Sequence, residues 1–276
     1  MIFIGGTGRC GTSILSYSLM QDDRCALFFE PQFLTFPGGL LEYAIDRRIT
    51  KEEFLVNMCG KFLRQILRHL NRMRVLPEAE SVYNVDFINS IDLAAVAGGQ
   101  RDKYAKMFTE MFLNEIHKYI GTSEILYKQP HLITKAGILQ WMFPDSKFIH
   151  IIRDPRDVCS SVIKLSWGPN SVKEFPAYYL DIMGAALEQR ADVPDDRYLV
   201  LSFDSLITHH WDIMYALYRF FDCNVPTSDL LSKLGKPIDQ NRAHSGRYKT
   251  DLSRKQSAFI YDECWETYQK WLKISI

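Results

Sequence analysis

The sequence predicts an α/β fold in which a central parallel sheet is covered by helices on both faces. Short apolar runs that suit buried strands alternate along the chain with longer segments of helical periodicity. Such alternation is typical of parallel sheets, because each helix carries the chain back to the edge where the next strand begins. A glycine-rich turn, Gly5 to Ser13, directly follows the first apolar run. We therefore expect a three-layer sandwich that forms one domain over residues 1–276.

The expected strands are short runs rich in apolar residues, and the expected helices carry apolar residues three or four positions apart. Strands are expected at residues 2–4, 25–29, 124–128, 147–152 and 197–203. Helices are expected at residues 14–20, 131–142, 155–166, 171–190, 209–221 and 253–273, with a polar loop at 236–251. Apolar residues at helical spacing also recur through the long connection before the third strand. This connection is predicted to be a helical insertion at about 40–120.

Composition excludes several classes of function. The chain carries 33 Lys and Arg and 33 Asp and Glu, and this zero net charge argues against a general nucleic-acid binder. None of the six cysteines forms a C-x-x-C pair, so neither a zinc ribbon nor a thioredoxin-type site is expected, and we expect no metal. Scattered thiols are typical of the reducing cytoplasm. We expect a cytoplasmic protein with no secretory leader and no membrane span.

The glycine-rich turn predicts a phosphate site. Backbone N–H groups at a helix N-terminus point toward an anion there, and the helix dipole favours negative charge. The turn differs from the P-loop of kinases and other NTPases: Gly6 and Gly11 have the required spacing and Thr12 follows, but the lysine between them is missing. Asp154 also follows Arg153 rather than a clean apolar strand, which argues against a magnesium-binding aspartate.

The same turn fits the G-x-G-x-x-G pattern of dinucleotide sites. Gly6, Gly8 and Gly11 match it, and Glu30 ends the second expected strand, where an acid would bind the ribose. This alternative predicts an NAD(P)-dependent oxidoreductase. It gives no role to Arg9 and does not explain the segment at 150–161.

That segment, H-I-I-R-D-P-R-D-V-C-S-S at 150–161, follows R-C-G-T-S at 9–13, and the pair resembles the sulfotransferases that use 3′-phosphoadenosine 5′-phosphosulfate (PAPS). In that family an [RK]-S-G-T-[TS] loop binds the 5′-phosphosulfate. An R-[DN]-P-[RK]-D strand end, with a serine eight residues after its first Arg, binds the 3′-phosphate. Arg153 and Ser161 have this spacing. The resemblance covers most of residues 1–166, and a weaker similarity continues to the end of the chain.

The resemblance implies a P-loop NTPase-like fold, with the helical insertion forming the acceptor site. It also implies a set of donor-binding residues, which are Arg9, Cys10, Gly11, Thr12, Ser13, Arg153, Ser161, Arg247 and Lys249. Cys10 replaces the family's usual serine, so we expect an oxidisable thiol against the donor. For Asp154, Arg156 and Asp157 we expect only capping of a helix and pairing with one another.

Two catalytic residues are implied as well. Glu30, in F-F-E-P, matches the base of the carbohydrate and tyrosyl-protein branches, and its apolar neighbours favour a raised pKa. Lys128, in Y-K-Q-P, matches a lysine that neutralises charge on the leaving phosphate, although a lysine at a strand end can also extend to solvent. His131 is the rival base, because cytosolic members use a histidine in this region; a structural hydrogen-bonded histidine is the favoured alternative.

The resemblance therefore predicts an enzyme that moves a sulfuryl group from PAPS to a hydroxyl or amine. By analogy with the members that use a glutamate base, the expected acceptor is a carbohydrate, a glycolipid or a small metabolite. A nucleotide-binding module without catalytic activity is a further alternative, and the presence of both Glu30 and Lys128 argues against it.

Overall fold

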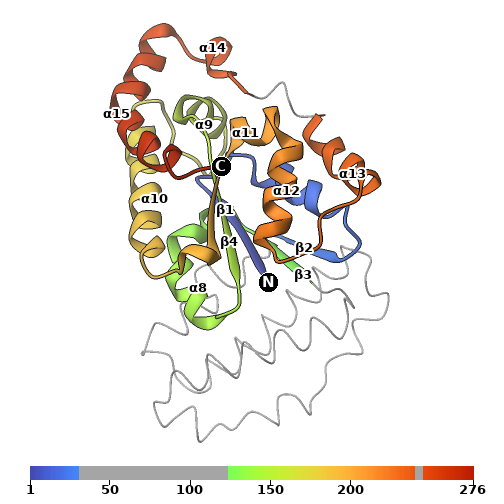
Figure 1. Cartoon of the computed structure of the whole chain (residues 1–276). Coiled ribbons are helices and arrows are strands. Elements are labelled where there is room, and N and C mark those ends of the chain that lie inside the picture. Colours follow the sequence, from blue (N-terminus) through green and yellow to red (C-terminus); the bar gives the residue numbers. More distant parts are fainter. Residues whose placement is uncertain (31–123, 240–244) are drawn as a thin grey trace, which may run out of the picture. The chain divides into compact units, whose positions relative to one another are not determined.

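The computed structural model describes residues 1–30, 124–239 and 245–276 (Figure 1). Contacts within the chain divide it into two compact units, one of Met1–Leu27 with Glu124–Ile276 and the other of Phe28–Ser123. The first unit contains nearly all of the described residues. The predicted helical insertion at about 40–120 lies outside them and stays a prediction.

Five strands form one sheet in the order β2-β3-β1-β4-β5. Their bounds are β1 Ile2–Gly6, β2 Cys25–Phe29, β3 Glu124–Lys128, β4 Lys147–Ile152 and β5 Tyr198–Ser202. Strand β1 pairs in parallel with β3 and β4, and β4 pairs in parallel with β5. Every residue of β1 and β4 is buried, which requires cover on both faces. The predicted α/β class with a central parallel sheet is confirmed.

Two groups of helices cover the sheet (Figure 1). One group is α8 Ala136–Met142, α9 Pro155–Val162, α10 Phe175–Arg190 and α15 Arg254–Leu272. The other is α1 Thr12–Leu19, α11 Phe203–Thr208, α12 His210–Phe220 and α13 Ser228–Asp239. Shorter elements are the 3₁₀ helices η3 Pro130–Lys135 and η4 Asp195–Arg197 and the single turn α14 Tyr248–Asp251. Among the helices that the structure describes, none has an apolar stretch long enough to cross a bilayer.

Local sequence explains how the helices beside the sheet begin. The carboxylate of Asp154 caps α9 by accepting a hydrogen bond from the Arg156 N–H at 2.9 Å, and Pro155 occupies the first helical position. Ser253 and Gln256 form a capping box at the start of α15. Both signals lie within a few residues of the helix start, and the starts predicted at 155 and 253 are correct to within one residue.

The predicted polar loop at 236–251 is wrong at both ends. Helix α13 continues to Asp239 although Pro237 lies inside it, and α14 begins at Tyr248. Helix α13 packs on α1 and α12, and its glycine has a packing role. A Cβ on Gly235 would lie 3.1 Å from the Trp211 ring, so the missing side chain admits the indole. Tertiary packing thus overrides the helix-breaking tendency of Gly and Pro.

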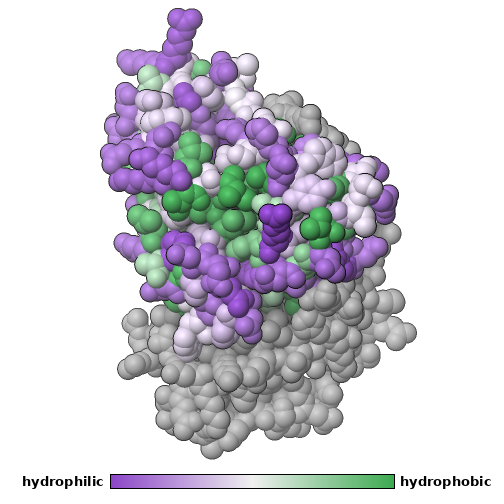
Figure 2. Space-filling model, viewed as in Figure 1, coloured by the Kyte–Doolittle hydropathy of each residue, from purple (hydrophilic) through white to green (hydrophobic). Residues whose placement is uncertain are grey.

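The outer edge of β5 is extended by the last residues of the chain. The Ile276 N–H donates to the Val200 carbonyl at 3.0 Å, and the Ser202 N–H donates to the Ile276 carbonyl at 3.0 Å. Figure 2 shows apolar side chains gathered around this C-terminal segment, where Ile274 is 57 % exposed. The backbone of the last residues therefore pairs with the outer edge of β5.

The order of the strands fixes where a ligand site can form. From β1 the sheet grows through β3 and β2 on one side and through β4 and β5 on the other. The carboxyl ends of β1 and β4 therefore lie at a topological switch point, which is where open α/β sheets bind ligands. The glycine-rich loop follows β1 at this place.

We expect Gly6→Ala to destabilise the protein by about 1–3 kcal/mol, because a Cβ there overpacks the core. It would overlap the Cys10 sulfur and lie 2.5 Å from the Ile151 carbonyl oxygen. The matched control is Gly184→Ala in α10, where no atom lies within 4 Å of the new Cβ and a gain of about 0.5–1 kcal/mol is expected. Denaturant unfolding measures both changes. Equal stabilities of the two variants would contradict this account of Gly6.

Candidate functional site

The glycine-rich loop connects β1 to α1 through an unusual backbone. Gly8, Arg9 and Gly11 have φ angles of 78°, 56° and 106°, all in the left-handed region. Gly11 is the N-cap of α1 and supplies no capping side chain, and a Cβ on it would overlap the Phe203 ring. Only glycine fits there, and the backbone turns so that the first turn of α1, with Thr12 and Ser13, begins directly at the loop.

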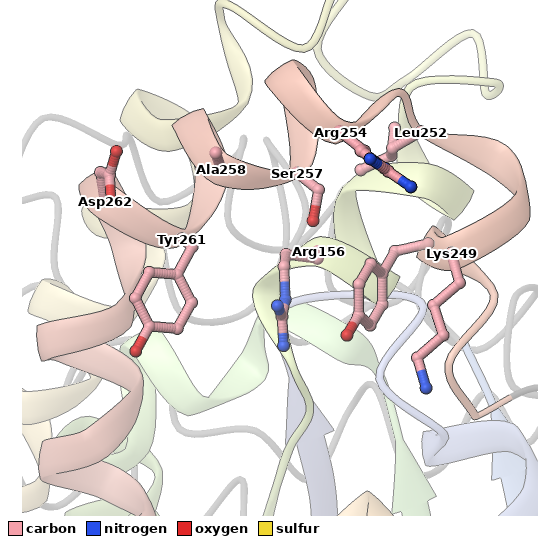
Figure 3. Close-up of a pocket in the computed structure, with 9 residues that line it drawn as sticks. Arg156, Lys249, Leu252, Arg254, Ser257, Ala258, Tyr261 and Asp262 are labelled. Atoms are coloured by element: carbon pink, nitrogen blue, oxygen red, sulfur yellow. The ribbon is translucent and has the colours of Figure 1, made fainter.

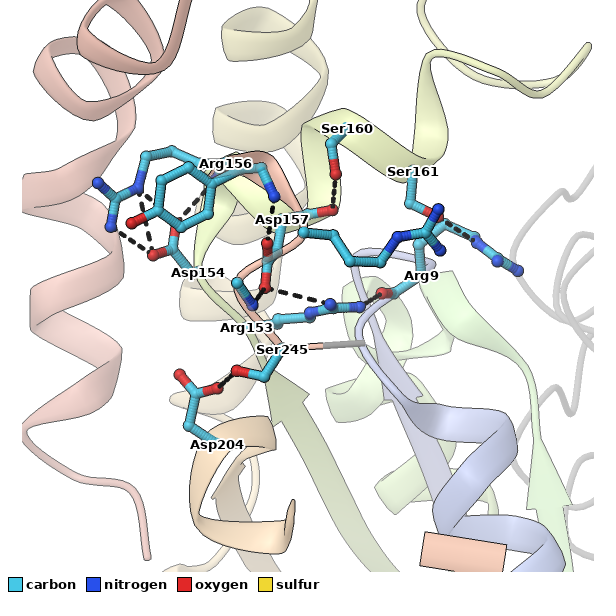
Figure 4. Close-up of polar contacts among 12 residues, drawn as sticks. Arg9, Arg153, Asp154, Arg156, Asp157, Ser160, Ser161, Asp204 and Ser245 are labelled. Atoms are coloured by element: carbon cyan, nitrogen blue, oxygen red, sulfur yellow. Dashed lines mark hydrogen bonds and ion pairs between the residues drawn. The ribbon is translucent and has the colours of Figure 1, made fainter. Parts of the chain in front are cut away.

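Arg9 connects this loop to α9. Its Nε donates a hydrogen bond of 2.9 Å to the Ser161 Oγ, although 152 positions separate the two residues (Figure 4). Arg9 is exposed and Ser161 is half-buried. The two motifs that the sequence analysis paired are therefore neighbours in space, with one predicted residue from each in direct contact.

Arg153 lies beneath the same loop at the carboxyl end of β4 and is only 7 % exposed. Its Nη1 donates to the Arg9 carbonyl at 3.0 Å, and its Nη2 donates to the Asp157 carboxylate at 3.1 Å. Its Cζ lies 4.3 Å from the centroid of the Phe203 ring. These contacts fix the guanidinium plane, and the structure thereby brings Arg9, Arg153 and Ser161 together.

Asp157 differs from its prediction. It is 2 % exposed and accepts hydrogen bonds from the backbone N–H groups of Gly246 at 2.8 Å and Tyr248 at 2.9 Å. The expectation of capping and local pairing is confirmed for Asp154 and Arg156, whose side chains form a salt bridge at 2.6 Å. For Asp157 the expectation is confirmed only in part: it pairs locally with Arg153, but it also binds a turn about ninety residues further along the chain.

The two predicted donor-binding cations of the C-terminal segment, Arg247 and Lys249, lie in different surroundings. Arg247 belongs to the turn that Asp157 binds, and its Nη2 lies 3.5 Å from the Asp251 carboxylate. Lys249 is exposed and lines a separate hollow of about 480 Å³ between α9, α14 and α15 (Figure 3). Arg156 lines the same hollow and stacks at 4.1 Å on the Tyr248 ring. None of Arg9, Arg153 and Ser161 lines it, so the structure does not place Lys249 with that cluster.

Lys128 is the last residue of β3 and lies opposite Ile4 of β1 in the parallel register. It is 1 % exposed, so the alternative that its side chain extends to solvent is wrong. Its positive charge, with that of Arg153, lowers the pKa of Cys10, although burial of the thiol has the larger and opposite effect. Lys128 therefore lies beside the glycine-rich loop at the carboxyl edge of the sheet.

Cys10 points into the core. Its side chain is fully buried and its sulfur packs against Gly6, and burial raises the pKa of the thiol. The expectation of an oxidisable thiol against the donor is wrong, because the space that a Cβ on Gly6 would fill holds this sulfur. A contribution of Cys10 through its backbone N–H stays a prediction.

His131 is connected to the glycine-rich loop through the hydroxyl of Tyr178. Tyr178 donates its hydroxyl proton to the Thr7 carbonyl at 2.6 Å and lies 3.0 Å from the His131 Nε2, so that nitrogen is the donor to the Tyr178 oxygen. The favoured structural role of His131 agrees with this network. Trp167 lies next to His131, with the two ring centroids 6.4 Å apart, and is 54 % exposed. A Cβ placed on Gly8 would lie 3.2 Å from its ring. Neither Tyr178 nor Trp167 belongs to a motif, and no signal in the sequence marks them.

Glu30 follows β2 and belongs to the second compact unit. It is exposed and has a left-handed φ of 48°, which is uncommon for a residue with a side chain. Its role as a base stays a prediction. Within residues 1–30, 124–239 and 245–276, no three His, Cys, Asp or Glu side chains are grouped as metal ligands.

A family model described as "Sulfotransferase family" matches residues 2–227. The structure is similar to the sulfotransferase domain of the Synechococcus PCC 7002 olefin synthase, with a TM-score of 0.57 and 15 % identity over 95 % of this chain and 93 % of that one. It is also similar to sulfotransferase STF9 from Mycobacterium avium, with a TM-score of 0.51 and 18 % identity over 96 % and 76 % of the two chains. At these identities the likeness shows the fold. No curated protein matches the chain.

We expect Cys10 to resist alkylation in the native protein at pH 8, because burial and a raised pKa both withhold the reactive thiolate. Half-buried Cys223 is the internal reference: burial raises the pKa of its thiol too, but its greater exposure should let it be labelled at least about tenfold faster. Peptide mass spectrometry after iodoacetamide treatment measures both rates, and denatured protein should lose the difference. Equal labelling of the two thiols in native protein would contradict the inward orientation of Cys10.

Proposed function

The chain belongs to the sulfotransferase family, and we propose that it transfers a sulfuryl group from PAPS to a hydroxyl or amine of its acceptor. One observation carries the donor part of this proposal: at the carboxyl edge of a parallel sheet, Arg9 of the glycine-rich loop bonds Ser161 through its side chain and Arg153 through its carbonyl. A donor with phosphates at two ends requires two neighbouring anion sites, and the two motifs supply them. This arrangement also explains Arg9 and the segment at 150–161, which a dinucleotide site leaves without a role.

The residues present fit such a donor chemically. Left-handed residues in the glycine-rich loop would allow backbone N–H groups to converge on an anion, and the first turn of α1 adds Thr12 and Ser13. Arg9 would bind the 5′ end and Arg153 with Ser161 the 3′-phosphate, each through charge-assisted hydrogen bonds. The Arg9 to Ser161 hydrogen bond would give way to stronger bonds with phosphate oxygens. Arg247 would approach the same phosphate from the C-terminal turn.

Each catalytic residue has one proposed task. The donor, when bound, supplies an electrophilic sulfur and a phosphate leaving group. Lys128, buried at the end of β3, would stabilise the charge that develops on that phosphate, and a site without water strengthens this effect. Glu30 would take the proton of the attacking acceptor. A sulfuryl group carries less charge than a γ-phosphoryl group, so this set of side chains needs no metal.

By analogy with the members that use a glutamate base, we assign a carbohydrate, a glycolipid or a small metabolite as the acceptor. The insertion at about 40–120 would form its pocket. The scattered cysteines and balanced charge suit a cytoplasmic protein that binds no nucleic acid.

We expect 3′,5′-bisphosphoadenosine (PAP) to raise the thermal stability of the protein, by about 2.7 kcal/mol at a hundred times its dissociation constant. NAD⁺, NADP⁺ and Mg-ATP should have little effect, and Arg153→Ala or Arg9→Ala should abolish the shift. Arg219→Ala is the matched control, since Arg219 is exposed on α12. A melting shift with NAD⁺ or NADP⁺ alone would instead make Glu30 a ribose ligand and refute the donor assignment.

We expect Glu30→Gln to lower turnover by about 10²–10⁴-fold, which is the usual contribution of a general base, while the affinity for PAP stays within about twofold. Release of PAP from labelled PAPS, with an acceptor found by screening hydroxylated compounds, measures turnover, and calorimetry measures affinity. The matched control is Glu124→Gln, because Glu124 is the first residue of β3, at the opposite end of that strand from Lys128. Full turnover by Glu30→Gln, together with loss of turnover in His131→Gln, would transfer the role of base to His131.

A further inference from the structure

The Asp157 carboxylate joins three separate parts of the chain. It lies in the first turn of α9 and is 2 % exposed. One of its oxygens accepts from Arg153 Nη2 at 3.1 Å and from the Gly246 N–H at 2.8 Å, and the other accepts from the Tyr248 N–H at 2.9 Å. Arg153 in turn reaches the Arg9 carbonyl of the glycine-rich loop. Figure 4 shows these contacts as one connected network.

This arrangement makes the carboxylate hard to replace. Three donors converge on it in a place that water does not reach, and a buried donor that loses its acceptor is left without hydrogen bonding. Arg153 would also lose the negative charge that compensates its own. An amide at position 157 keeps one oxygen but turns an N–H₂ group toward a donor, so it cannot satisfy all three partners.

The backbone of the C-terminal turn is held to α9 by the two N–H groups that bind Asp157. Gly246 has a φ of 75°, and a Cβ there would meet only the flexible Lys249 side chain at 3.9 Å. The Ser245 hydroxyl donates a further hydrogen bond of 2.6 Å to the carboxylate of half-buried Asp204 at the start of α11. The two N–H bonds to Asp157 therefore determine where this turn lies relative to Arg153.

We propose that Asp157 is a positioning residue that holds the turn Ser245–Tyr248 against Arg153, so that the part of the donor site that binds the 3′-phosphate forms as one unit. This inference rests on the proposed function, because it assigns Arg153 and Arg247 to that phosphate. Asp157 itself does not touch the donor. The Asp157 carboxylate would repel a 3′-phosphate bound nearby. Its placement of Arg153 and of the turn strengthens phosphate binding by more than this repulsion weakens it.

The direction in which Asp157→Asn changes the affinity for PAP distinguishes a positioning role from simple repulsion of the phosphate. Asp157→Asn is expected to weaken PAP binding by at least about tenfold, as loss of a buried charge partner commonly does. Binding of adenosine 5′-monophosphate (AMP), which lacks the 3′-phosphate, should change by less than about twofold. A purely structural defect would weaken both nucleotides alike. Tighter binding of PAP by the variant would mean that repulsion dominates, and it would overturn the proposal.

A second variant perturbs the turn from its other side. Gly246→Ala strains a left-handed position without touching the core, so the fold should persist. It should reproduce the selective loss of PAP affinity, and the double variant should lose less than the two single losses combined, because both act through one contact. Additive losses would overturn the proposal. Asp181→Asn is the matched control, since it makes the same change at an exposed aspartate of α10.

Tryptic cleavage tests the position of the turn without any nucleotide. Release of the turn in Asp157→Asn should speed cleavage of the Arg247–Tyr248 bond by about tenfold or more, as local opening exposes it. Unchanged cleavage would overturn the inference even if PAP binds the parent protein. If the turn is released in the variant but the parent protein does not bind PAP, the proposed function fails while Asp157 keeps its place as anchor of the turn.

Discussion

The buried guanidinium of Arg153 is the constraint around which the site is organised. A charge that is 7 % exposed needs compensation, and it receives a carboxylate from Asp157, a carbonyl from Arg9 and the face of Phe203. Each partner comes from a different segment: helix α9, the glycine-rich loop and the start of α11. Satisfying one charge therefore fixes three backbone segments at the carboxyl edge of the sheet. In the proposed function, this guanidinium would bind an anion at that edge.

The glycine-rich loop depends on a second constraint, which is space. Phe203 packs where a side chain on Gly11 would lie, and the Cys10 sulfur fills the position of a Cβ on Gly6. The loop can turn sharply only because these positions lack side chains, and the sharp turn starts α1 directly at the loop. Below it, Tyr178 binds the Thr7 carbonyl, so the loop backbone is held from two sides. A rigid loop of this kind binds an anion without first having to be ordered.

The sequence allowed the sheet, its flanking helices and the pairing of two distant motifs to be predicted, because each rests on a local pattern. The strand at 147–152 was correct at both ends, and the Arg153 to Ser161 spacing placed both residues beside the loop. The prediction for Cys10 was wrong and the prediction for Asp157 was incomplete, for a common reason. The role of each depends on atoms far along the chain, which no local pattern records. Helix α13 was missed because Pro237 and Gly235 outweighed a helical face that only packing on α1 and α12 makes stable.

The two halves of the proposed donor site differ in how firmly they are held. Arg9 is exposed, and its bond to Ser161 competes with water, so it contributes little stability and can be exchanged for a phosphate oxygen. The Arg153 to Asp157 pair is buried and tied to the backbone of a distant turn. It follows that a donor would meet a preformed part at the 3′-phosphate and an adjustable part at the 5′ end. This division suits a transfer reaction, because the sulfuryl group must move to the acceptor while the nucleotide that carried it stays fixed.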